Sequence, residues 1–465
     1  MGETHNLRQM AREKLGFEEL RPGQEEAVRA LTAGRDTLVV MTTGSGKSAI
    51  YQIAGWVIEG ATLVISPLIS LQRDQIENIE DEQPGEAAAI DASVSEARRE
   101  ERLEELAEEE LEFLFLAPEQ LARKETVERL AEANISLLVV DEAHCISEWG
   151  HDFRPDYLRI GDVAKRLGSP TVLALTATAA PPVRDEIVER LNMREPELIV
   201  RGFDRPNIRL EVDRHHDERA KRRALLDRVE ELGGPGIVYV ATRRTSEELA
   251  DELSERGLRA LAYHAGLSGG RRDEAQEAFM EDELDVIVAT TAFGMGVDKP
   301  NVRFVLHNEP SESLDSYYQE IGRAGRDGEP AEAVLFYRTE DLGLRKFFAG
   351  GGDDEARRAF NQSRVEMMRG YAEHDHCRRA FILSYFGERA AEECGNCDNC
   401  EAGRGRAEHG DRPFDVGVVV RHGEWGEGVV QRYDGDQVAI LFEDVGYKTL
   451  SVELVTERGL LETVS

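Results

Sequence analysis

Short apolar runs alternate with longer charged segments through the first two hundred residues of the chain. The runs have the length of strands, and most of the segments between them are long enough for a helix. A strand that is buried on both faces carries a continuous apolar run, as the strands of parallel sheets do. The pattern therefore predicts a parallel sheet covered by helices, an α/β fold. The expected strands are residues 37–40, 62–65, 113–116, 137–140 and 172–175.

The same alternation starts again beyond residue 207 and predicts a second α/β domain. Gly202 and Pro206 interrupt the pattern and mark the join. From residue 414 onward, short β-like runs with glycine turns predict a small β-barrel or sheet. The strands expected in the second domain are residues 236–240, 286–289, 302–306 and 333–337. The expected segments are 1–205 and 206–350 as two α/β domains, 351–402 as a helical metal-binding subdomain, 403–413 as a linker and 414–465 as a small β module.

The charge of the chain limits how it meets nucleic acid. Among 465 residues, 57 are Lys or Arg and 92 are Asp or Glu, which gives 57 − 92 = −35. This balance argues against a general basic coat, so any contact with phosphates must use local cationic patches. The acid excess fits either a solvated surface or adaptation to a salty cytoplasm, and residues 100–112 are expected to form one exposed acidic helix face. No apolar run reaches the roughly 20 residues of a membrane span, and the polar N-terminus has no signal core. We expect a cytoplasmic protein without a membrane partner.

A phosphate loop is the first candidate site. Residues 41–48 follow a strand run and precede a helical segment. Glycines let backbone N–H groups approach phosphate, and the start of a helix favours anions. Lys47 would contact the β- and γ-phosphates of ATP, and Ser48 would hold Mg²⁺. Met41 stands where the widest pattern has Gly, and a chance surface loop is the alternative. The loop residues proposed to bind nucleotide are Thr43, Gly44, Ser45, Gly46, Lys47 and Ser48.

Two further segments carry chemistry that suits ATP hydrolysis. Asp141 and Glu142 end the fourth apolar run, where a carboxylate can bind Mg²⁺ and its neighbour can orient water. Alone, such a pair is usually a polar strand end. Arg323 and Arg326 lie three residues apart, on one face if the segment is helical. They could stabilise charge on a transferred phosphoryl group, although a basic surface helix is the plain alternative.

Four of the five cysteines cluster near the C-terminus. Cys377, Cys394, Cys397 and Cys400 supply four thiolates, which suit a closed tetrahedral zinc site. Free thiols or an iron–sulfur cluster are the alternatives. Cys145 stands apart and is expected to be a buried thiol.

These blocks resemble the motifs of superfamily 2 helicases, and of the RecQ family in particular, from about residue 10 to residue 400. The resemblance implies two tandem RecA-like domains with ATP bound between them, and a zinc-binding subdomain. It implies an adenine-reading motif with Arg21 and Gln24, and a motif V with Gly294 and Asp298. The catalytic residues that it implies are Lys47, Asp141, Glu142, Gln319, Arg323 and Arg326.

Residues 146–155 resemble the aromatic-rich loop of the RecQ family. An aromatic ring can stack on a base, and an arginine can meet a phosphate. The position after the Mg²⁺ carboxylates could couple ATP state to the grip on DNA. Without the flanking motifs, Trp149 and Phe153 would more often be core residues. The expected DNA contacts are Trp149, His151, Phe153 and Arg154.

The segment after the cysteines departs from the family pattern. RecQ helicases often continue with a winged helix and a helical DNA-binding domain, whereas 65 residues (465 − 400) follow Cys400 here. This tail is similar to the small Tudor- or SH3-like module of UvrD-type helicases, which implies a contact with protein or nucleic acid. Trp425 and Tyr433 could form an exposed aromatic site or belong to the core of the module.

The resemblance implies an ATP-dependent DNA helicase that moves 3′→5′ on single-stranded, tailed or branched DNA during repair and recombination. Its cofactors would be ATP, Mg²⁺ and Zn²⁺. A DNA-dependent translocase that remodels protein–DNA complexes with little unwinding is the main alternative, favoured by the expected lack of a winged helix. An RNA helicase and a non-catalytic DNA-binding scaffold are the others. The aromatic loop and cysteines argue against the first, and the complete ATP motifs argue against the second.

Overall fold

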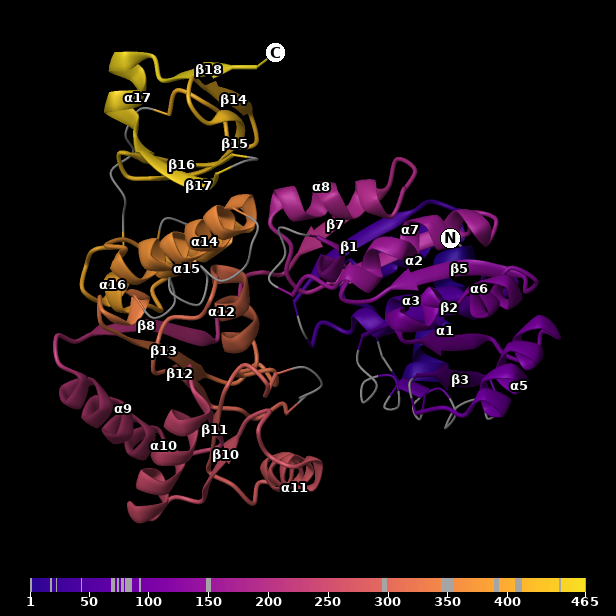
Figure 1. Cartoon of the computed structure of the whole chain (residues 1–465), viewed down its shortest axis with the longest axis horizontal. Coiled ribbons are helices and arrows are strands. Elements are labelled where there is room, and N and C mark those ends of the chain that lie inside the picture. The colour runs from indigo at the N-terminus through magenta and orange to yellow at the C-terminus, as the bar shows by residue number, and fades with distance from the viewer. Residues whose placement is uncertain are drawn as a thin grey trace. The chain divides into compact units, whose positions relative to one another are not determined.

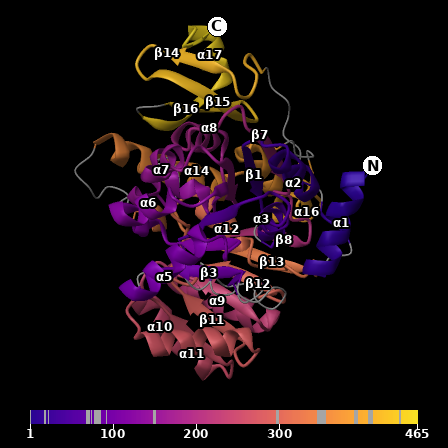
Figure 2. The same ribbon diagram turned by 90° about the vertical axis from the view of Figure 1, so that its right-hand side faces the viewer.

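The structure of the protein is a computed structural model. It describes residues 2–464 except 17–18, 22, 43, 68–71, 73–74, 77–78, 80–85, 92, 148–151, 295–298, 344–354, 389–392, 406–411 and 443–444. The chain forms two compact units, Met1–Gly202 and Phe203–Ser465. Figures 1 and 2 allow each unit to be followed along the chain, from α1 at the N-terminus to the C-terminal lobe with α17.

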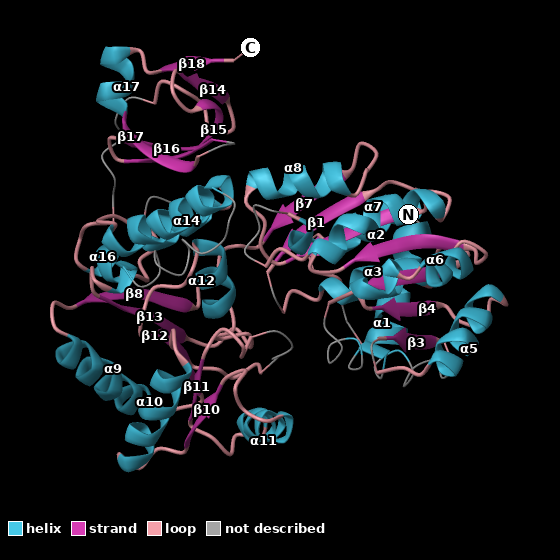
Figure 3. Cartoon of the chain, viewed as in Figure 1, coloured by secondary structure: helices cyan, strands magenta, loops and turns pink. Residues whose placement is uncertain are grey.

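The first unit is built on a seven-stranded parallel sheet with the order β3-β4-β2-β5-β6-β1-β7. The central strands are buried almost throughout, because helices lie on both faces of the sheet (Figure 3). The predicted α/β fold is confirmed, and each expected strand is present. The strands are β1 (Thr37–Met41), β2 (Ala61–Ile65), β3 (Ala87–Ile90), β4 (Phe113–Leu116), β5 (Ile135–Val140), β6 (Thr171–Thr176) and β7 (Glu197–Arg201). The helices are α1 (Gly2–Leu15), α2 (Gln24–Thr32), α3 (Lys47–Gly55), α5 (Glu96–Ala107), α6 (Lys124–Leu130), α7 (Ile160–Arg166) and α8 (Pro181–Arg190).

The topology of this sheet places two loops of the first unit at the same edge. β1 pairs with β6, and β6 pairs in turn with β5, all in parallel. The carboxyl ends of parallel strands lie at one edge of a sheet, where α/β proteins bind their ligands. The loops that follow β1 and β5 are those that carry the phosphate-loop residues and the paired carboxylates.

The acidic stretch at 100–112 is not one exposed helix face. Helix α5 ends at Ala107, Glu109 has a positive φ of 61°, and Glu112 lies half-buried just before β4. Burial, and then the charge of Glu86, raise the pKa of Glu112 to about 7, although Lys14 acts in the opposite direction. The chain turns inward here because the apolar run after Glu112 must enter the sheet.

Glu112→Gln is expected to stabilise the first unit at pH 8. The folded chain holds the Glu112 proton up to about pH 7, whereas the unfolded chain releases it near 4.5, so stability is lost as pH rises between these values. We expect a gain of about 1 kcal/mol at pH 8, discounted for partial exposure, and a smaller gain at pH 5. Urea unfolding at both pH values measures the change in the free energy of unfolding. Glu110→Gln removes an exposed charge and is the control; equal effects of the two variants would contradict the assignment.

The second unit contains a six-stranded parallel sheet with the order β10-β11-β9-β12-β13-β8. Its inner strands are apolar and buried, as the sequence pattern predicts. The strands are β8 (Ile208–Arg214), β9 (Gly236–Tyr239), β10 (Ala260–Tyr263), β11 (Val286–Ala289), β12 (Phe304–His307) and β13 (Ala331–Tyr337). The helices of this part are α9 (Glu218–Leu232), α10 (Arg243–Glu255), α11 (Gly269–Met280) and α12 (Leu314–Ile321). Among the described residues, 3₁₀ segments lie in the first unit, at η1 (Pro118–Ala122), η2 (Ala143–Ile146) and η3 (Pro155–Arg159).

A helical subdomain covers the edge strand β8 of this sheet. It consists of α14 (Glu355–Glu373), α15 (Arg378–Tyr385) and α16 (Asp398–Glu401). The Leu210 backbone N–H of β8 donates to Asn396 O at 3.3 Å, and the Val212 N–H donates to Asp398 Oδ2 at 3.2 Å. The cysteine-rich turn therefore satisfies strand groups that an open edge would leave exposed.

The C-terminal segment is a five-stranded antiparallel sheet with the order β17-β16-β15-β14-β18, which confirms the predicted β module. It has its own apolar core, built around buried residues such as Val430, Ile440 and Phe442. The first strand starts at Val419, later than the apolar run at 416 suggests. The elements are β14 (Val419–His422), β15 (Gly426–Asp434), β16 (Gln437–Phe442), β17 (Gly446–Ser451), α17 (Val452–Arg458) and β18 (Leu461–Thr463).

The two aromatic residues of interest in this module pack within it. The Trp425 ring is stacked on His422 at 4.1 Å between centroids. The Phe442 centroid lies 5.5 Å away, and the Lys448 ammonium lies 5.5 Å from the centroid of the Trp425 ring. The Tyr433 hydroxyl donates to Phe414 O at 2.9 Å. These contacts support the core alternative for both residues.

No helix among the described residues has the length and apolar character required to cross a membrane.

Candidate active site and metal centre

The loop between β1 and α3 has the backbone shape of a phosphate cradle. Gly44 and Gly46 have φ values of 75° and 76°, a conformation that favours glycine. A Cβ at Gly46 would also lie 2.6 Å from the Gln24 side-chain nitrogen. The chain enters α3 at Lys47, so the free N–H groups of the helix start face the loop.

Gln24 and Arg21 brace this loop. Gln24 is only 2% exposed, and its Nε2 donates to Ser45 O at 3.2 Å and Gly46 O at 2.8 Å. Its Oε1 accepts from the Arg21 backbone N–H at 2.7 Å, and Arg21 Nη1 donates to Gly44 O at 2.6 Å. Both residues, expected to read adenine, therefore also contact the phosphate loop. Thr43, the remaining loop residue of the predicted set, lies outside the described residues.

Lys47 and Ser48 begin α3 beside the loop. The Lys47 ammonium donates to Met41 O at 2.9 Å and to Thr42 O at 3.2 Å. The Ser48 side chain is hydrogen-bonded to Tyr51, whose pKa is raised above its usual value mainly by burial. Two carbonyl oxygens thus hold Lys47 over the cradle. Phosphate oxygens would be stronger acceptors for its ammonium, because they are charged.

Asp141 and Glu142 follow β5 at the same edge of the sheet. Asp141 Oδ2 accepts from Ser66 Oγ at 3.2 Å, and its Oδ1 accepts from the Glu142 backbone N–H at 3.0 Å. Burial and then the Glu142 charge raise the pKa of Asp141 to about 6, while the charge of Lys47 lowers it. Asp141 therefore lies close enough to Lys47 to be affected by its charge. A carboxylate and a serine hydroxyl near a phosphate cradle are ligands that suit Mg²⁺.

Three residues outside the predicted set hold this carboxylate segment. Tyr157 donates to Asp141 O at 2.9 Å, and His144 Nδ1 lies 2.9 Å from Thr176 Oγ1 and 3.3 Å from a Glu142 carboxylate oxygen. The side chain of Glu142 is thereby tied to the end of β6. The sheet order brings Thr176 on β6 beside β5, and nothing local in the sequence points to Tyr157.

The aromatic-rich loop is described in part, since Trp149 and His151 lie outside the described residues. Arg154 Nη2 donates to Asp152 Oδ2 at 3.1 Å, and the Arg154 backbone N–H donates to Cys145 O at 2.9 Å. Phe153 is partly exposed beside them. Cys145 is buried, as expected, and burial raises the pKa of its thiol. The loop is thus bonded directly to the segment that follows the two carboxylates.

The candidate arginines of the second unit lie in a turn. α12 ends at Ile321, so the helical arrangement considered for Arg323 and Arg326 is wrong: both lie in the segment Gly322–Gly328, here called the arginine turn. Gln319 belongs to the last turn of α12. A Cβ at Gly294 would lie 3.0 Å from Arg323 Nη2, so the motif V glycine makes room for this guanidinium. Asp298 lies outside the described residues.

Arg205 fixes the backbone of the arginine turn. Its Nη1 donates to Gly322 O at 3.0 Å, and its Nη2 donates to Ala324 O at 2.8 Å and Gly325 O at 2.9 Å. The turn needs this brace because its carbonyls have left the helix ladder. Arg205 was not among the predicted site residues, and no local motif marks it.

The four clustered thiols meet in space. All four Sγ atoms lie within 4.8 Å of one another, and those of Cys394 and Cys400 are 3.9 Å apart. Zn–S bonds of about 2.3 Å in a tetrahedron imply S–S distances of about 3.8 Å, so the thiols fit zinc. Backbone N–H groups donate to two sulfurs, from Ala380 to Cys377 at 3.5 Å and from Asn396 to Cys394 at 3.4 Å.

The comparisons with known proteins first give the class of the chain. Residues 21–187 match the model described as DEAD/DEAH box helicase, and residues 220–328 match the helicase conserved C-terminal domain. Solved structures of the same fold include yeast (S. cerevisiae) Dbp5 bound to RNA and ADP BeF3, at a TM-score of 0.56, with 18% identity over 76% of this chain and 92% of that one. The Pyrococcus furiosus Hef helicase domain matches at a TM-score of 0.50, with 18% identity over 71% of this chain and 98% of that one. Two RecA-like sheets with a phosphate loop and paired carboxylates define a helicase core.

Residues 339–401 match the RecQ zinc-binding model. The ATP-dependent DNA helicase RecQ of Bacillus subtilis is 40% identical over 85% of this chain and 67% of its own length. The RecQ of Pasteurella multocida is 40% identical over 83% of this chain and 60% of its own length. The probable ATP-dependent DNA helicase RecS of B. subtilis is 41% identical over 73% of this chain and 68% of its own length. The chain belongs to the RecQ family of ATP-dependent DNA helicases, and it spans 60 to 68% of the length of these relatives. The predicted family and cofactors are confirmed at this level, and the four clustered thiols have the arrangement that zinc requires.

Proposed function

We propose that this protein is an ATP-dependent DNA helicase that moves 3′→5′ along single-stranded DNA and separates duplexes in repair and recombination. The observation that carries the proposal is the single site formed by the phosphate loop, Lys47 and Asp141 in a chain of the RecQ family. The relatives are named DNA helicases, which favours DNA over RNA as the substrate. Single-stranded, tailed or branched DNA is the proposed partner, and the cytoplasm the proposed location.

The side chains of the first unit have separate tasks in ATP hydrolysis. Lys47 exchanges its two carbonyl acceptors for phosphate oxygens, and the loop N–H groups hold the phosphates from below. Ser48 and Asp141 would hold Mg²⁺, which would neutralise negative charge at the phosphates. Glu142 orients the attacking water, and its tie to His144 fixes the direction of its carboxylate. Arg21 and Gln24 link the base-reading segment to the loop.

The second unit supplies the remaining groups. Arg326 and Arg323 stabilise the charge that develops on the transferred phosphoryl group, and Gln319 contributes from the same segment. Gly294 and Asp298 complete the nucleotide contacts. Trp149, His151, Phe153 and Arg154 contact DNA, and the bond between Arg154 and Cys145 O carries the nucleotide state to them. Cyclic opening and closing of the two units then moves the chain along the strand.

A translocase with little unwinding is the second candidate. It is favoured by the fold of residues 419–463, which form an antiparallel β module and not a winged helix. In this case the module would hold a protein partner or direct the chain to protein–DNA complexes.

Tailed duplexes separate the two candidates. We expect ATP-driven opening of a duplex with a 3′ single-stranded tail and none of a matched duplex with a 5′ tail, measured across a salt series because the chain carries a net charge of −35. Lys47→Ala is the inactive control. DNA-stimulated ATP hydrolysis without opening of either duplex would replace the helicase by the translocase. Opening of the 5′-tailed duplex alone would overturn the direction.

A further inference from the structure

The C-terminal β module is bound to the helical subdomain through a close contact at Gly446. This glycine has a φ of 69° and lies on α14, where an added Cβ would overlap Ser363 Oγ and come within 3.2 Å of the Phe360 Cα. Only glycine allows the β17 backbone to approach the helix this closely. The next residue, Tyr447, is buried between the Phe360 and Tyr385 rings, with centroids 6.4 and 5.9 Å away.

Arg432 fixes the module at a second point. Its guanidinium lies 3.6 Å from the centroid of the Phe381 ring on α15, and its Nη2 lies 3.8 Å from Met367 Sδ on α14. Arg432 is only 4% exposed, a burial that strengthens such a cation–π contact. The module therefore packs on α14 and α15 of the subdomain.

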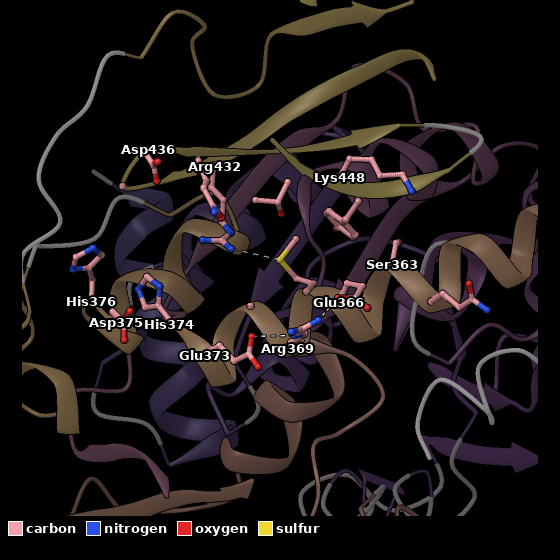
Figure 4. Close-up of a pocket in the computed structure, with 17 residues that line it drawn as sticks. Ser363, Glu366, Arg369, Glu373, His374, Asp375, His376, Arg432, Asp436 and Lys448 are labelled. Carbon is pink, nitrogen blue, oxygen red and sulfur yellow. Dashed lines mark hydrogen bonds and ion pairs between the residues drawn. The ribbon is translucent and has the colours of Figure 1, made fainter. Parts of the chain in front are cut away.

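Between these contacts lies a cleft of about 800 Å³, shown in Figure 4. Its floor is α14, and its roof is formed by β15, β17 and the turn at Asp436. Arginine, lysine, histidine, glutamate and aspartate side chains all line it, so its charge selects no single kind of ligand.

A buried chain of hydroxyl groups runs from the module to α12. Tyr447 donates to the Tyr385 hydroxyl oxygen at 3.4 Å, and Tyr385 donates to Asp315 Oδ2 at 2.5 Å. Burial raises the pKa of both phenols above the usual value, so both keep their protons at neutral pH and act as donors. The bond to the Asp315 carboxylate is short and charge-assisted, whereas the bond between the phenols is long and weaker.

Asp315 lies in the first turn of α12, the helix that leads into the arginine turn. Two tyrosines of α12 also contact the subdomain. The Tyr317 hydroxyl oxygen lies 3.4 Å from that of Tyr371, and the Tyr318 ring packs on Phe386 with 4.9 Å between centroids. A short helix held along its length in this way has few alternative positions, and the same holds for the turn that continues it.

We propose that the C-terminal β module is a positioning element for the arginine turn, and that Tyr385 and Tyr447 are positioning residues which hold α12 through Asp315. The module would then support ATP hydrolysis from within the same unit, in addition to any partner that it binds. This inference rests on the proposed role of Arg323 and Arg326, but the position of α12 can be measured without that role.

Hydrogen exchange of the full chain tests the physical link. Gly446→Ala should push the module from α14 and raise the exchange of the α12 and arginine-turn amides at least about threefold. Gly459→Ala is the matched control, because Gly459 also has a positive φ, 59°, in the same module but has nothing within 4 Å of an added Cβ. Equal exchange in the two variants would overturn the link, even if the chain had no ATPase activity.

DNA-stimulated ATP hydrolysis tests the functional consequence. Tyr385→Phe should lower kcat about tenfold and Tyr447→Phe about threefold, with KM for ATP changed less than twofold. In a background that carries both Arg323→Ala and Arg326→Ala, neither substitution should lower kcat further, because the groups that they position are gone. Full additivity in that background, or unchanged kcat in both single variants, would overturn the positioning role. A wild-type chain without ATPase activity would instead refute the proposed function and leave hydrogen exchange as the test of the link.

Discussion

Lys47→Ala is expected to reduce ATP hydrolysis by at least about a hundredfold, the loss seen when one preorganised group that stabilises the transition state is removed. Two effects act together. The variant loses the ammonium that would meet the phosphates, and it loses the charge that lowers the pKa of Asp141, so the affinity for Mg²⁺ should fall as well.

The fold should survive this substitution. Lys47 is only partly buried, and its ammonium donates to two backbone carbonyls, so the shortened side chain leaves no core cavity. DNA-stimulated ATPase assays and thermal unfolding measure the two outcomes. Lys124→Ala, which removes an exposed lysine of the same unit, is the matched control. ATPase activity within twofold of the wild type would sink the assignment of the site.

Loss of zinc is expected to unfold the cysteine-rich subdomain. Structural zinc supplies folding free energy, because the ligands cannot meet in the unfolded chain. Cys397→Ser should abolish stoichiometric zinc binding and lower the Tm of the second unit by about 10 °C or more. Each kcal/mol lost from the free energy of unfolding lowers the Tm by a few degrees. The turn at Asn396 and Asp398 should then leave β8, which exposes the edge of the sheet.

Zinc analysis and calorimetry with and without a chelator measure this effect. Cys145→Ser is the control, because this thiol belongs to the first unit and lies outside the cluster of four. It should leave zinc content unchanged. A zinc-loaded sample whose thermal unfolding is indifferent to chelation would show that the metal does not stabilise the fold.

The α/β units and their nucleotide loop could be predicted from the sequence because their signals are local. A fully buried strand such as β4 is apolar along its whole length, and a phosphate loop needs glycine at positions where φ is positive. The zinc site could be predicted in the same way, because only a few kinds of side chain bind zinc. The spacing of the four cysteines also reflects the turn that surrounds the ion. These features depend on stretches of a few residues each.

The residues that hold the site in place could not be predicted from the sequence, because they contact the site only in the folded chain. Tyr157 reaches Asp141 O, and Arg205 reaches three carbonyls of a turn more than a hundred residues further along. No pattern near Tyr157 or Arg205 distinguishes it from an ordinary core tyrosine or surface arginine. Their roles are set by sheet order and by the path of the chain after α12.

The C-terminal module shows the same division. Its β character follows from short apolar runs and glycine turns, and the sequence alone determines that. The tertiary structure decided that Trp425 is partly buried, because His422, Phe442 and Lys448 lie against its ring. Only the tertiary structure brings Gly446 against α14 and Tyr447 next to Tyr385, because a contact between surfaces depends on the shapes of both and leaves no periodic mark in either sequence.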